Sequence, residues 1–250
     1  MSTEDVDLLK RTLRRREALV TLGGLGAGVV WAATRGSAGL ARAAVAAPHA
    51  TAAATCVLTP EVTEGPYWIS NHLTRRNIKD GRPGLTLALY VTVVDATTCK
   101  PIAGADVEIW HADAGGVYSG YSGSSPPSGG GGHATPNNSK RYLRGHQKSD
   151  ANGRVRFDTI YPGWYRGRTP HIHLKVHVGG SVVHTGQLFF ADATSRAVYR
   201  TSKYRSHGLQ DTTNRSDSIY AQAGGSKALV HLARRSAGGY NGSIAVGVRR

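Results

Sequence analysis

The sequence lacks long segments with helical periodicity. Apolar residues recur at helical spacing only over the short segment 226–234, and no internal repeat is visible. These absences argue against a helical bundle and against a repeat architecture. Methionine is almost missing, with one residue, whereas glycine is abundant, with 32 residues. Such a composition is typical of strand-rich chains with many tight turns.

Concentrated charge is also missing. The formal net charge is +15, but the Lys and Arg residues after position 74 are scattered singly or in pairs. The sequence shows no basic run with interleaved aromatic residues, the pattern typical of nucleic-acid-binding proteins. We therefore expect a solvated basic surface and no nucleic-acid partner. Such a surface would attract anionic aromatic compounds only weakly at physiological salt.

The first 47 residues have the features of an export signal rather than of a fold. Arginines 14–16 precede an apolar, glycine-rich stretch at 19–33, which is shorter than the ~20 residues of a membrane span. Small residues at 41–47 offer a signal-peptidase site. The twin arginine predicts export by the twin-arginine route, so that residues 48–250 are secreted or held at the cell surface. We expect no membrane segment in this mature form; an uncleaved membrane anchor is the alternative.

The two cysteines, Cys56 and Cys99, both fall in the predicted mature chain. An even number of cysteines in an exported chain favours a disulfide between them. Closing a loop of this length would stabilise the fold by roughly 4 kcal/mol in the chain-entropy model. The alternative is lipidation of Cys56, for which the preceding residues, Ala54 and Thr55, form a poor signal.

Several short segments of the mature chain have the composition and alternation of β-strands. They are residues 85–94, 106–111, 154–160, 171–178 and 182–190. Short strands separated by turn signals predict an all-β fold, an antiparallel β-sandwich with long loops. Residues 119–140, which are rich in Gly, Ser and Pro, are expected to form a flexible loop with too little apolar surface to pack.

The most informative segment for function is the predicted strand 171–178. Its polar residues alternate with aliphatic ones that can anchor the strand in a core. His171 and His173 can therefore point at one metal ion, although a solvated polar face is the alternative for these two residues alone. Tyr165 precedes them after a Pro-Gly turn that can fold its phenol back toward the strand. A phenol ligand needs a strong Lewis acid, which favours ferric iron over zinc.

Four segments of the chain resemble the intradiol ring-cleavage dioxygenases, in the same order along the sequence. They are TPEVTEGPYW (59–68), GADVEIWHADAGGVYSG (104–120), the segment 142–176 that ends in PGWYRGRTPHIHLKV, and HTGQLFF (184–190). The sequence is similar to the protocatechuate and catechol dioxygenases, and most similar to their exported, single-chain branch. This resemblance implies an intradiol dioxygenase-like β-sandwich catalytic domain over residues 48–250.

The resemblance implies a ferric ion, Fe(3+), as the cofactor. By position its four ligands are Tyr118, Tyr165, His171 and His173. Tyr121 is an alternative to Tyr118, although its spacing from the preceding Trp-His pair differs from that of the family. Arg168 matches a family arginine and would stabilise negative charge on the bound substrate. Gln187 matches a glutamine that shapes the substrate pocket. The alternatives are a surface ion pair for Arg168 and a hydrogen bond within the sheet for Gln187.

The implied reaction cleaves a catechol-type aromatic diol with O2 to a muconate-type dicarboxylic acid. Tyr165 is expected to leave the metal and to accept a proton as the catechol binds. Arg166 and Gly167 depart from the family, where an aromatic residue commonly follows this tyrosine. This departure leaves the substrate side of the pocket more open or more cationic.

Two other functions remain open from the sequence. One is an exported β-sandwich module that binds carbohydrate or a cell surface without iron chemistry. The other is a zinc or copper enzyme built on the histidine pair. The sequence also allows a homodimer. The remaining histidines carry no assigned role: we expect His111 in the core or behind the ligands, and His146 and His177 in solvent.

Overall fold

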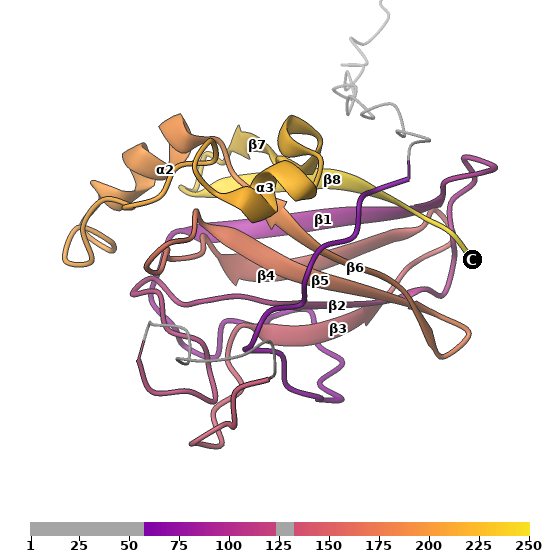
Figure 1. Cartoon of the computed structure of the whole chain (residues 1–250), viewed down its shortest axis with the longest axis horizontal. Coiled ribbons are helices and arrows are strands. Elements are labelled where there is room, and N and C mark those ends of the chain that lie inside the picture. The colour runs from indigo at the N-terminus through magenta and orange to yellow at the C-terminus, as the bar shows by residue number, and fades with distance from the viewer. Residues whose placement is uncertain (1–57, 124–132) are drawn as a thin grey trace, which may run out of the picture. The chain divides into compact units, whose positions relative to one another are not determined.

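The computed structural model describes residues 58–123 and 133–250. The predicted export signal, Cys56 and the central part of the predicted 119–140 loop lie outside these described residues. Figure 1 labels the strands and the two α-helices. The strands are β1 (Thr86–Asp95), β2 (Asp106–Trp110), β3 (Arg144–Lys148), β4 (Arg154–Ile160), β5 (His171–Val178), β6 (Ser181–Phe189), β7 (His231–Arg234) and β8 (Tyr240–Val248). The helices are α2 (Asp192–Tyr199), α3 (Ser218–Gln222) and the 3-10 helix η1 (Gly225–Ala228). No helix in the described part of the chain is long and apolar enough to span a membrane.

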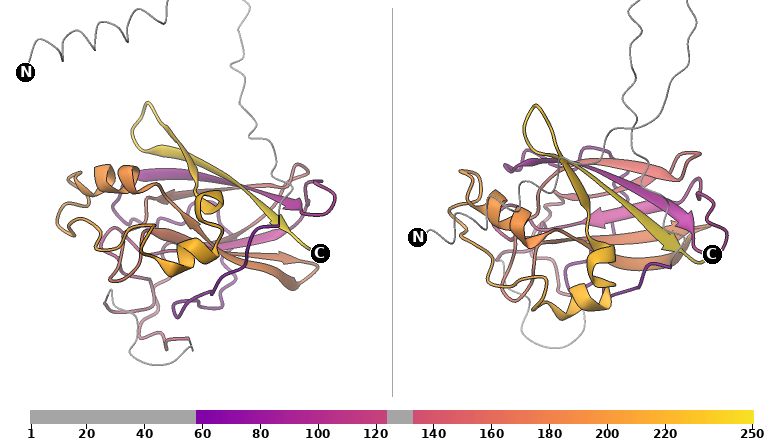
Figure 2. Two further views of the ribbon diagram at one scale, coloured as in Figure 1. Left: turned by 45° about the horizontal axis from the view of Figure 1, so that its top comes forward. Right: turned by 90° about the horizontal axis from the view of Figure 1, so that it is seen from above.

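The strands form two sheets of four, and their arrangement can be followed in Figures 1 and 2. Their orders are β4-β1-β8-β7 and β3-β2-β5-β6. The predicted β-sandwich is therefore confirmed. One pairing differs from the antiparallel expectation, because β1 and β8 run parallel. Strands so far apart in the sequence are joined through a long connection, which leaves either direction open to the chain.

The core lies between the two sheets and is built from alternate residues of their strands. Leu87 and Leu89 on β1 and Ile172 and Leu174 on β5 are fully buried in one hydrophobic cluster. Because strand residues alternate between faces, the intervening residues of β5 point to the opposite face of the β3-β2-β5-β6 sheet. The aliphatic half of β5 thus fixes the strand while its histidine half faces away from the core.

The predicted strands at 154–160 and 171–178 are observed at those bounds, and the other three differ by one residue at one end or at both. The segment 226–234 is not an α-helix, although its apolar spacing is helical. Helix η1 ends at Ala228, and β7 begins at His231 and pairs with β8. The amide of Val230 donates to the carbonyl of Phe189 on β6 at 2.8 Å, so hydrogen bonds to other strands override the local pattern.

The expectation that the loop 119–140 does not pack is wrong for its described ends. Tyr121 is 8% exposed and packs in a cluster with Tyr67, against which Ala134 also packs. The Tyr121 hydroxyl donates to the carbonyl of Ala134 at 3.1 Å. Tyr121 therefore supplies enough apolar surface to pack, although the segment as a whole is rich in Gly and Ser. Residues 124–132 lie outside the described residues, so the prediction for them is untested.

Candidate metal and active site

Strand β5 carries His171 and His173 on the face of the sheet that points away from the core. In the sheet register, His173 lies opposite Trp110 of β2 and Gln187 of β6. Both histidines are nearly completely buried, at 2% and 1% exposure. They are therefore covered by other segments, and the solvated polar face is ruled out for them.

The two predicted tyrosine ligands come from loops that lie over this face. Tyr118 follows β2, and Tyr165 lies in the turn that precedes β5. This turn is closed by a hydrogen bond from the Arg168 amide to the Tyr165 carbonyl at 3.0 Å. Gly163 allows the chain to pass close to Asp113, since a Cβ at this position would lie 2.2 Å from the Asp113 carbonyl oxygen. The predicted fold-back of the Tyr165 phenol onto the strand is thus observed.

The four predicted ligand atoms converge in one place. The Tyr118 Oη lies 3.0 Å from His173 Nε2 and 3.4 Å from His171 Nε2. The Tyr165 Oη lies 3.2 Å from His171 Nε2, and the two Nε2 atoms are 3.1 Å apart. Tyr118 and Tyr165 are 1% and 4% exposed. The structure therefore gathers two phenol oxygens and two imidazole nitrogens in a buried cluster.

Burial sets the protonation of these groups in the absence of a cation. It lowers the pKa of His171 and His173 well below their usual value, and the positive charge of Arg168 acts in the same direction. It also raises the pKa of the Tyr118 and Tyr165 phenols. The His171 Nδ1 lies 2.7 Å from the carbonyl of Thr169 and donates to it, so that His171 Nε2 carries a lone pair. Both imidazoles are thus neutral and available as ligands.

The cluster fits a bound metal ion with tyrosine and histidine ligands. Four donors that share one ion at ~2.1 Å lie about 3.0–3.4 Å apart for angles of roughly 90–110°, which matches the observed separations. Among the described residues, no group of three or more His, Cys, Asp or Glu side chains is placed to hold a metal. Phenolates beside neutral imidazoles favour a strong Lewis acid such as ferric iron.

The predicted Arg168 and Gln187 also lie at this cluster. Arg168 Nη1 donates to the Tyr165 Oη at 3.3 Å, and Arg168 Nη2 donates to Gln187 Oε1 at 2.6 Å. The amide of Gln187 donates to the carbonyl of Thr63 at 2.9 Å. Arg168 is not a surface ion pair, since its carboxylate partner, Asp217, has a side chain that is 1% exposed. Gln187 links the arginine to the segment that covers the site.

The rival ligand Tyr121 makes different contacts. Its hydroxyl donates to Ala134, as described above, and its ring packs edge-on against Tyr67 at 5.0 Å between centroids. Tyr118 supplies the phenol that faces the two histidines. The structure therefore supports the ligand that the spacing of the sequence favoured.

Sequence reasoning missed several residues that shape the site. The Tyr67 ring stacks on Tyr118 with centroids 4.5 Å apart, and the Trp110 ring stacks on His173 at 4.9 Å. Gly65 has φ +71°, and a Cβ there would lie 3.1 Å from His173 Cε1. Gly65 and Tyr67 belong to the segment 59–68, whose resemblance to the dioxygenases was the one available signal.

The prediction for His111 is confirmed, because it lies in the core. Its side chain is 1% exposed and lies directly after strand β2. Its two ring nitrogens lie 2.8 Å from the carbonyl of Ala112 and 2.7 Å from Thr159 Oγ1. Burial lowers the pKa of His111 to about 4, so this imidazole is neutral at physiological pH.

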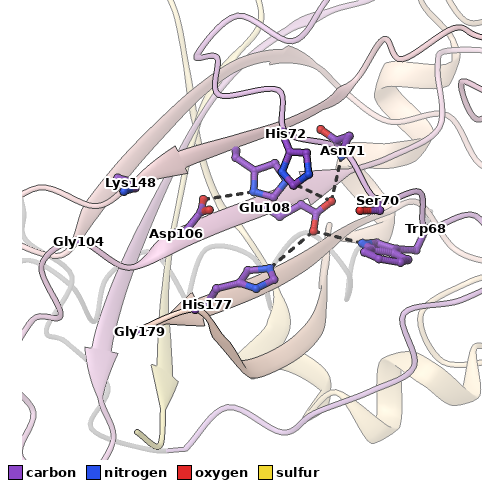
Figure 3. A pocket seen from close by; sticks show the side chains of 12 residues that line it. Trp68, Ser70, Asn71, His72, Gly104, Asp106, Glu108, Lys148, His177 and Gly179 are labelled. Atoms are coloured by element: carbon purple, nitrogen blue, oxygen red, sulfur yellow. Dashed lines mark hydrogen bonds and ion pairs between the residues drawn. The ribbon is translucent and has the colours of Figure 1, made fainter.

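His146 and His177 are only partly exposed, which corrects the expectation that they lie in solvent. They line a pocket of about 450 Å³, shown in Figure 3, in which their side chains are 12% and 22% exposed. The buried Glu108 carboxylate lies between them, with His146 Nε2 at 3.5 Å and His177 Nε2 at 3.8 Å. It also accepts hydrogen bonds from Trp68 Nε1 at 3.2 Å and Asn71 Nδ2 at 3.1 Å.

This pocket is separate from the tyrosine-histidine cluster, although both lie on the same face of the sheet. Glu108 is two residues from Trp110 on β2 and lies opposite Lys175 of β5. The Lys175 ammonium lies over the Trp68 ring at 4.2 Å and forms an ion pair with Glu64. Trp68 lines the pocket, and Lys175 lies on β5 between His177 at the pocket and His173 at the candidate metal site.

The fold and the site together define a β-sandwich protein with a candidate metal centre of two tyrosines and two histidines. Residues 60–195 match the sequence model of a family described as Dioxygenase. The chain belongs to this family, and its relatives of known structure place it with the intradiol ring-cleavage dioxygenases. The family predicted from the four sequence segments is thus confirmed.

Three relatives illustrate this placement. An intradiol ring-cleavage dioxygenase from Tetranychus urticae is 37% identical with a TM-score of 0.72, over 78% of this chain and 95% of that one. The dioxygenase domain of a dioxygenase and carbohydrate-binding fusion from Streptomyces sp. SirexAA-E is 27% identical with a TM-score of 0.54, over 77% and 98% of the two chains. Catechol 1,2-dioxygenase from Acinetobacter baylyi is 33% identical over 114 residues, which are 43% of this chain and 32% of that protein. The match thus spans about a third of the length of this curated relative.

Proposed function

We propose that the chain is a non-haem ferric dioxygenase that cleaves catechol-type diols with O2 between the two hydroxylated carbons. The products would be muconate-type dicarboxylic acids. The convergence of the Tyr118, Tyr165, His171 and His173 donor atoms within 3.0–3.4 Å carries this proposal. The names of the relatives, an intradiol ring-cleavage dioxygenase and a catechol 1,2-dioxygenase, support the substrate class.

Ferric iron, held by these four side chains, would supply Lewis acidity and redox chemistry toward catechol and O2. Tyr165 is the residue placed to accept a proton from a catechol hydroxyl. Its Oη faces both His171 Nε2 and the guanidinium of Arg168. Burial raises the pKa of this phenol, and the charge of Arg168 opposes that effect. Tyr165 can therefore hold a proton once its oxygen is free.

Arg168 and Gln187 would stabilise the negative charge that develops on the substrate. The guanidinium is fixed by its hydrogen bond to Gln187 and lies beside the Tyr165 phenol, next to the place where the diol would bind. Fixed donors in a water-poor site stabilise developing charge more than solvent does. The stacked rings of Tyr67 and Trp110 cover two of the ligands and keep water from them. Arg166 and Gly167, which follow Tyr165, are exposed, which agrees with a substrate side that is more open or more cationic than in the family.

The alternatives are less well supported. A carbohydrate- or surface-binding module has no need of two phenols buried against two neutral imidazoles. A zinc or copper enzyme built on the histidine pair gives no reason for both tyrosines to point at the same place. No observation on the described residues favours either function.

We further propose that residues 1–47 direct export by the twin-arginine route and that the mature protein is secreted or held at the cell surface. The pairing of Cys56 with Cys99 belongs to this proposal, since an oxidising compartment is where such a bond persists. N-terminal sequencing of the protein recovered from culture medium or from the cell envelope tests the cleavage. An intact N-terminus in the cytoplasmic fraction would contradict export.

The proposed reaction is tested with ferric-loaded protein, catechol and ¹⁸O-labelled O2. We expect O2 uptake equal to catechol consumed, and one labelled oxygen atom in each new carboxyl group, measured by mass spectrometry. Cleavage next to the hydroxylated carbons rather than between them would give a different product. That product, or catechol recovered intact, would contradict the proposed reaction.

A further inference from the structure

One buried carboxylate joins helix α3 to the turn that precedes β5. Asp217 Oδ2 accepts hydrogen bonds from Arg168 Nε at 2.9 Å and from the amide of Thr169 at 3.0 Å. Asp217 Oδ1 accepts from the amides of Ile219 at 2.9 Å and Tyr220 at 3.4 Å, which caps α3. The side chain is 1% exposed. Both oxygens are therefore occupied, one by the helix and one by the site.

The arginine held by Asp217 is the one that enters the site. The Nε–H of Arg168 points at Asp217, while Nη1 and Nη2 reach Tyr165 and Gln187. A guanidinium is planar, so fixing its Nε–H also fixes the directions of its Nη donors. The amide of Thr169 donates a hydrogen bond to the same carboxylate oxygen. The carbonyl of Thr169 accepts a hydrogen bond from His171 Nδ1. One carboxylate therefore holds both the arginine fork and the backbone that orients a histidine.

We infer that Asp217 is the positioning residue of Arg168 in the reaction proposed above, on which this inference rests. It acts from outside the site and contacts no candidate metal ligand in the structure. Its ion pair with Arg168 Nε sets the direction of the guanidinium. The Nη1 and Nη2 atoms remain free to contact Tyr165, Gln187 and the substrate. Helix α3 supplies the fixed support for this carboxylate.

An N-terminal cap alone does not explain the residue. Capping uses only Oδ1, and Asn or Ser caps a helix about as well as Asp. Oδ2 faces two further N–H donors, and only a carboxylate accepts on both sides. In Asp217→Asn, an amide group that caps α3 through its oxygen turns its NH2 toward Arg168 and Thr169. This variant therefore keeps the cap and breaks the contact with the arginine.

The test is a double-mutant cycle on kcat for catechol with ferric-loaded protein. We expect Asp217→Asn to lower kcat roughly 10-fold or more, with a smaller change in KM, because the Arg168 guanidinium is no longer held in its orientation. In an Arg168→Lys background, which has no fork to aim, the same substitution should change kcat by less than about two-fold. Arg168→Lys keeps the positive charge beside Asp217, so no buried charge is left unpaired. Equal losses in both backgrounds would overturn the inference.

Asp192→Asn is the matched control. Asp192 accepts a hydrogen bond from the amide of Asn214 at 3.1 Å, and Asn214 lies in the segment that leads to α3. Asp192 does not contact Arg168. Its substitution should leave kcat within about two-fold of the wild type, since only the anchoring of the segment is changed. A loss as large as that of Asp217→Asn would assign the effect to the segment and overturn the inference.

Hydrogen exchange measured by mass spectrometry gives a readout without turnover. In Asp217→Asn the peptide that spans 165–171 should exchange faster at the Thr169 amide, whereas Asp192→Asn should leave it unchanged. If the wild type does not consume catechol, the proposed function fails while this measurement still tests the anchoring by Asp217. Unchanged exchange in Asp217→Asn would contradict that anchoring whatever the activity.

Discussion

At the scale of single residues, the candidate site combines near neighbours in the sequence with side chains from distant segments. The two histidines and Tyr165 are close in sequence, so strand alternation and one turn sufficed to predict that they meet. Tyr118, Arg168 and Gln187 were predicted from the family resemblance, and the structure brings all three to the same place. Asp217 was not predictable, because it is 49 residues from Arg168 and its segment carries no recognisable motif.

Replacing Tyr165 with Phe removes the phenol that is proposed to accept the substrate proton. We expect kcat for catechol to fall by about 100-fold or more, the usual contribution of a general acid-base group, and the visible band of the ferric-loaded protein to shift or weaken. Steady-state kinetics and absorption spectra check both effects. Tyr121→Phe is the control, since it removes a phenol whose hydroxyl contacts Ala134 instead of the histidines. Unchanged colour and rate in Tyr165→Phe would remove this residue from the ligand set.

Gly65 and Gly81 allow a matched test of the space around His173. Both have positive φ, at +71° and +73°, but only at Gly65 would a Cβ contact a side chain, 3.1 Å from His173 Cε1. We expect Ala at either position to destabilise the fold by about 1–2 kcal/mol, measured by urea unfolding. Gly65→Ala should in addition weaken ferric binding, measured by competition with a chelator. Equal ferric affinity in the two variants would show that His173 tolerates the added methyl group.

At the scale of elements, patterned strands were predictable and short or glycine-rich ones were not. Strand β5 was predicted at its bounds because its aliphatic residues alternate strictly with polar ones. Strand β3 has a polar sequence, RGHQK, β7 has only four residues, HLAR, and β8 contains two glycines, so none of them has a clear period. The parallel pairing of β1 with β8 depends on the folding of the whole chain and has no local signal.

The outward face shared by β2, β3 and β5 gives a prediction on pH dependence. His146 faces Asp106 at 3.2 Å and Glu108 at 3.5 Å, and its ring lies 6.2 Å from that of His177. Burial favours the neutral form of His146, but hydrogen bonds and charge from the two carboxylates outweigh it and raise its pKa above 6.5. A raised pKa contributes stability below the unfolded-state value, and this contribution is lost as pH rises through the folded-state value.

We therefore expect His146→Gln to reduce the free energy of unfolding more at pH 5.5 than at pH 8.5, in urea titrations at both pH values. His231→Gln, which changes an exposed histidine on β7, is the control and should show the same small effect at both. A larger loss of unfolding free energy for His146→Gln at pH 8.5 than at pH 5.5 would contradict this prediction. It would mean that the neutral imidazole is the stabilising form.

At the scale of the whole molecule, the site couples the sandwich to the loops that cover it. The candidate ligands come from β5, from the loop after β2 and from the turn before β5, and the covering segment contributes Tyr67. A metal ion that binds all of them stabilises the folded chain only, by mass action. The fold class was predictable because it depends on many strands at once, whereas the covering segment depends on contacts distant in sequence.

Removal of the metal should lower the melting temperature of the protein. We expect ferric-loaded protein to unfold at a higher temperature than chelator-treated protein, with the difference growing with free iron concentration. Calorimetry on both forms measures it. In a Tyr118→Phe variant the difference should shrink, since one of four ligands is lost. An identical melting temperature with and without iron would contradict a site that joins these segments.

The most direct test of ferric ligation by tyrosine is the visible absorption spectrum of the ferric-loaded mature protein, recorded before and after anaerobic addition of catechol. We expect a tyrosinate-to-iron band that shifts when catechol is added, because the diol displaces a ligand and binds at the same centre. This result would show ferric binding, phenolate ligation and substrate access in one experiment. A protein that remains colourless after loading with ferric iron would contradict the dioxygenase account.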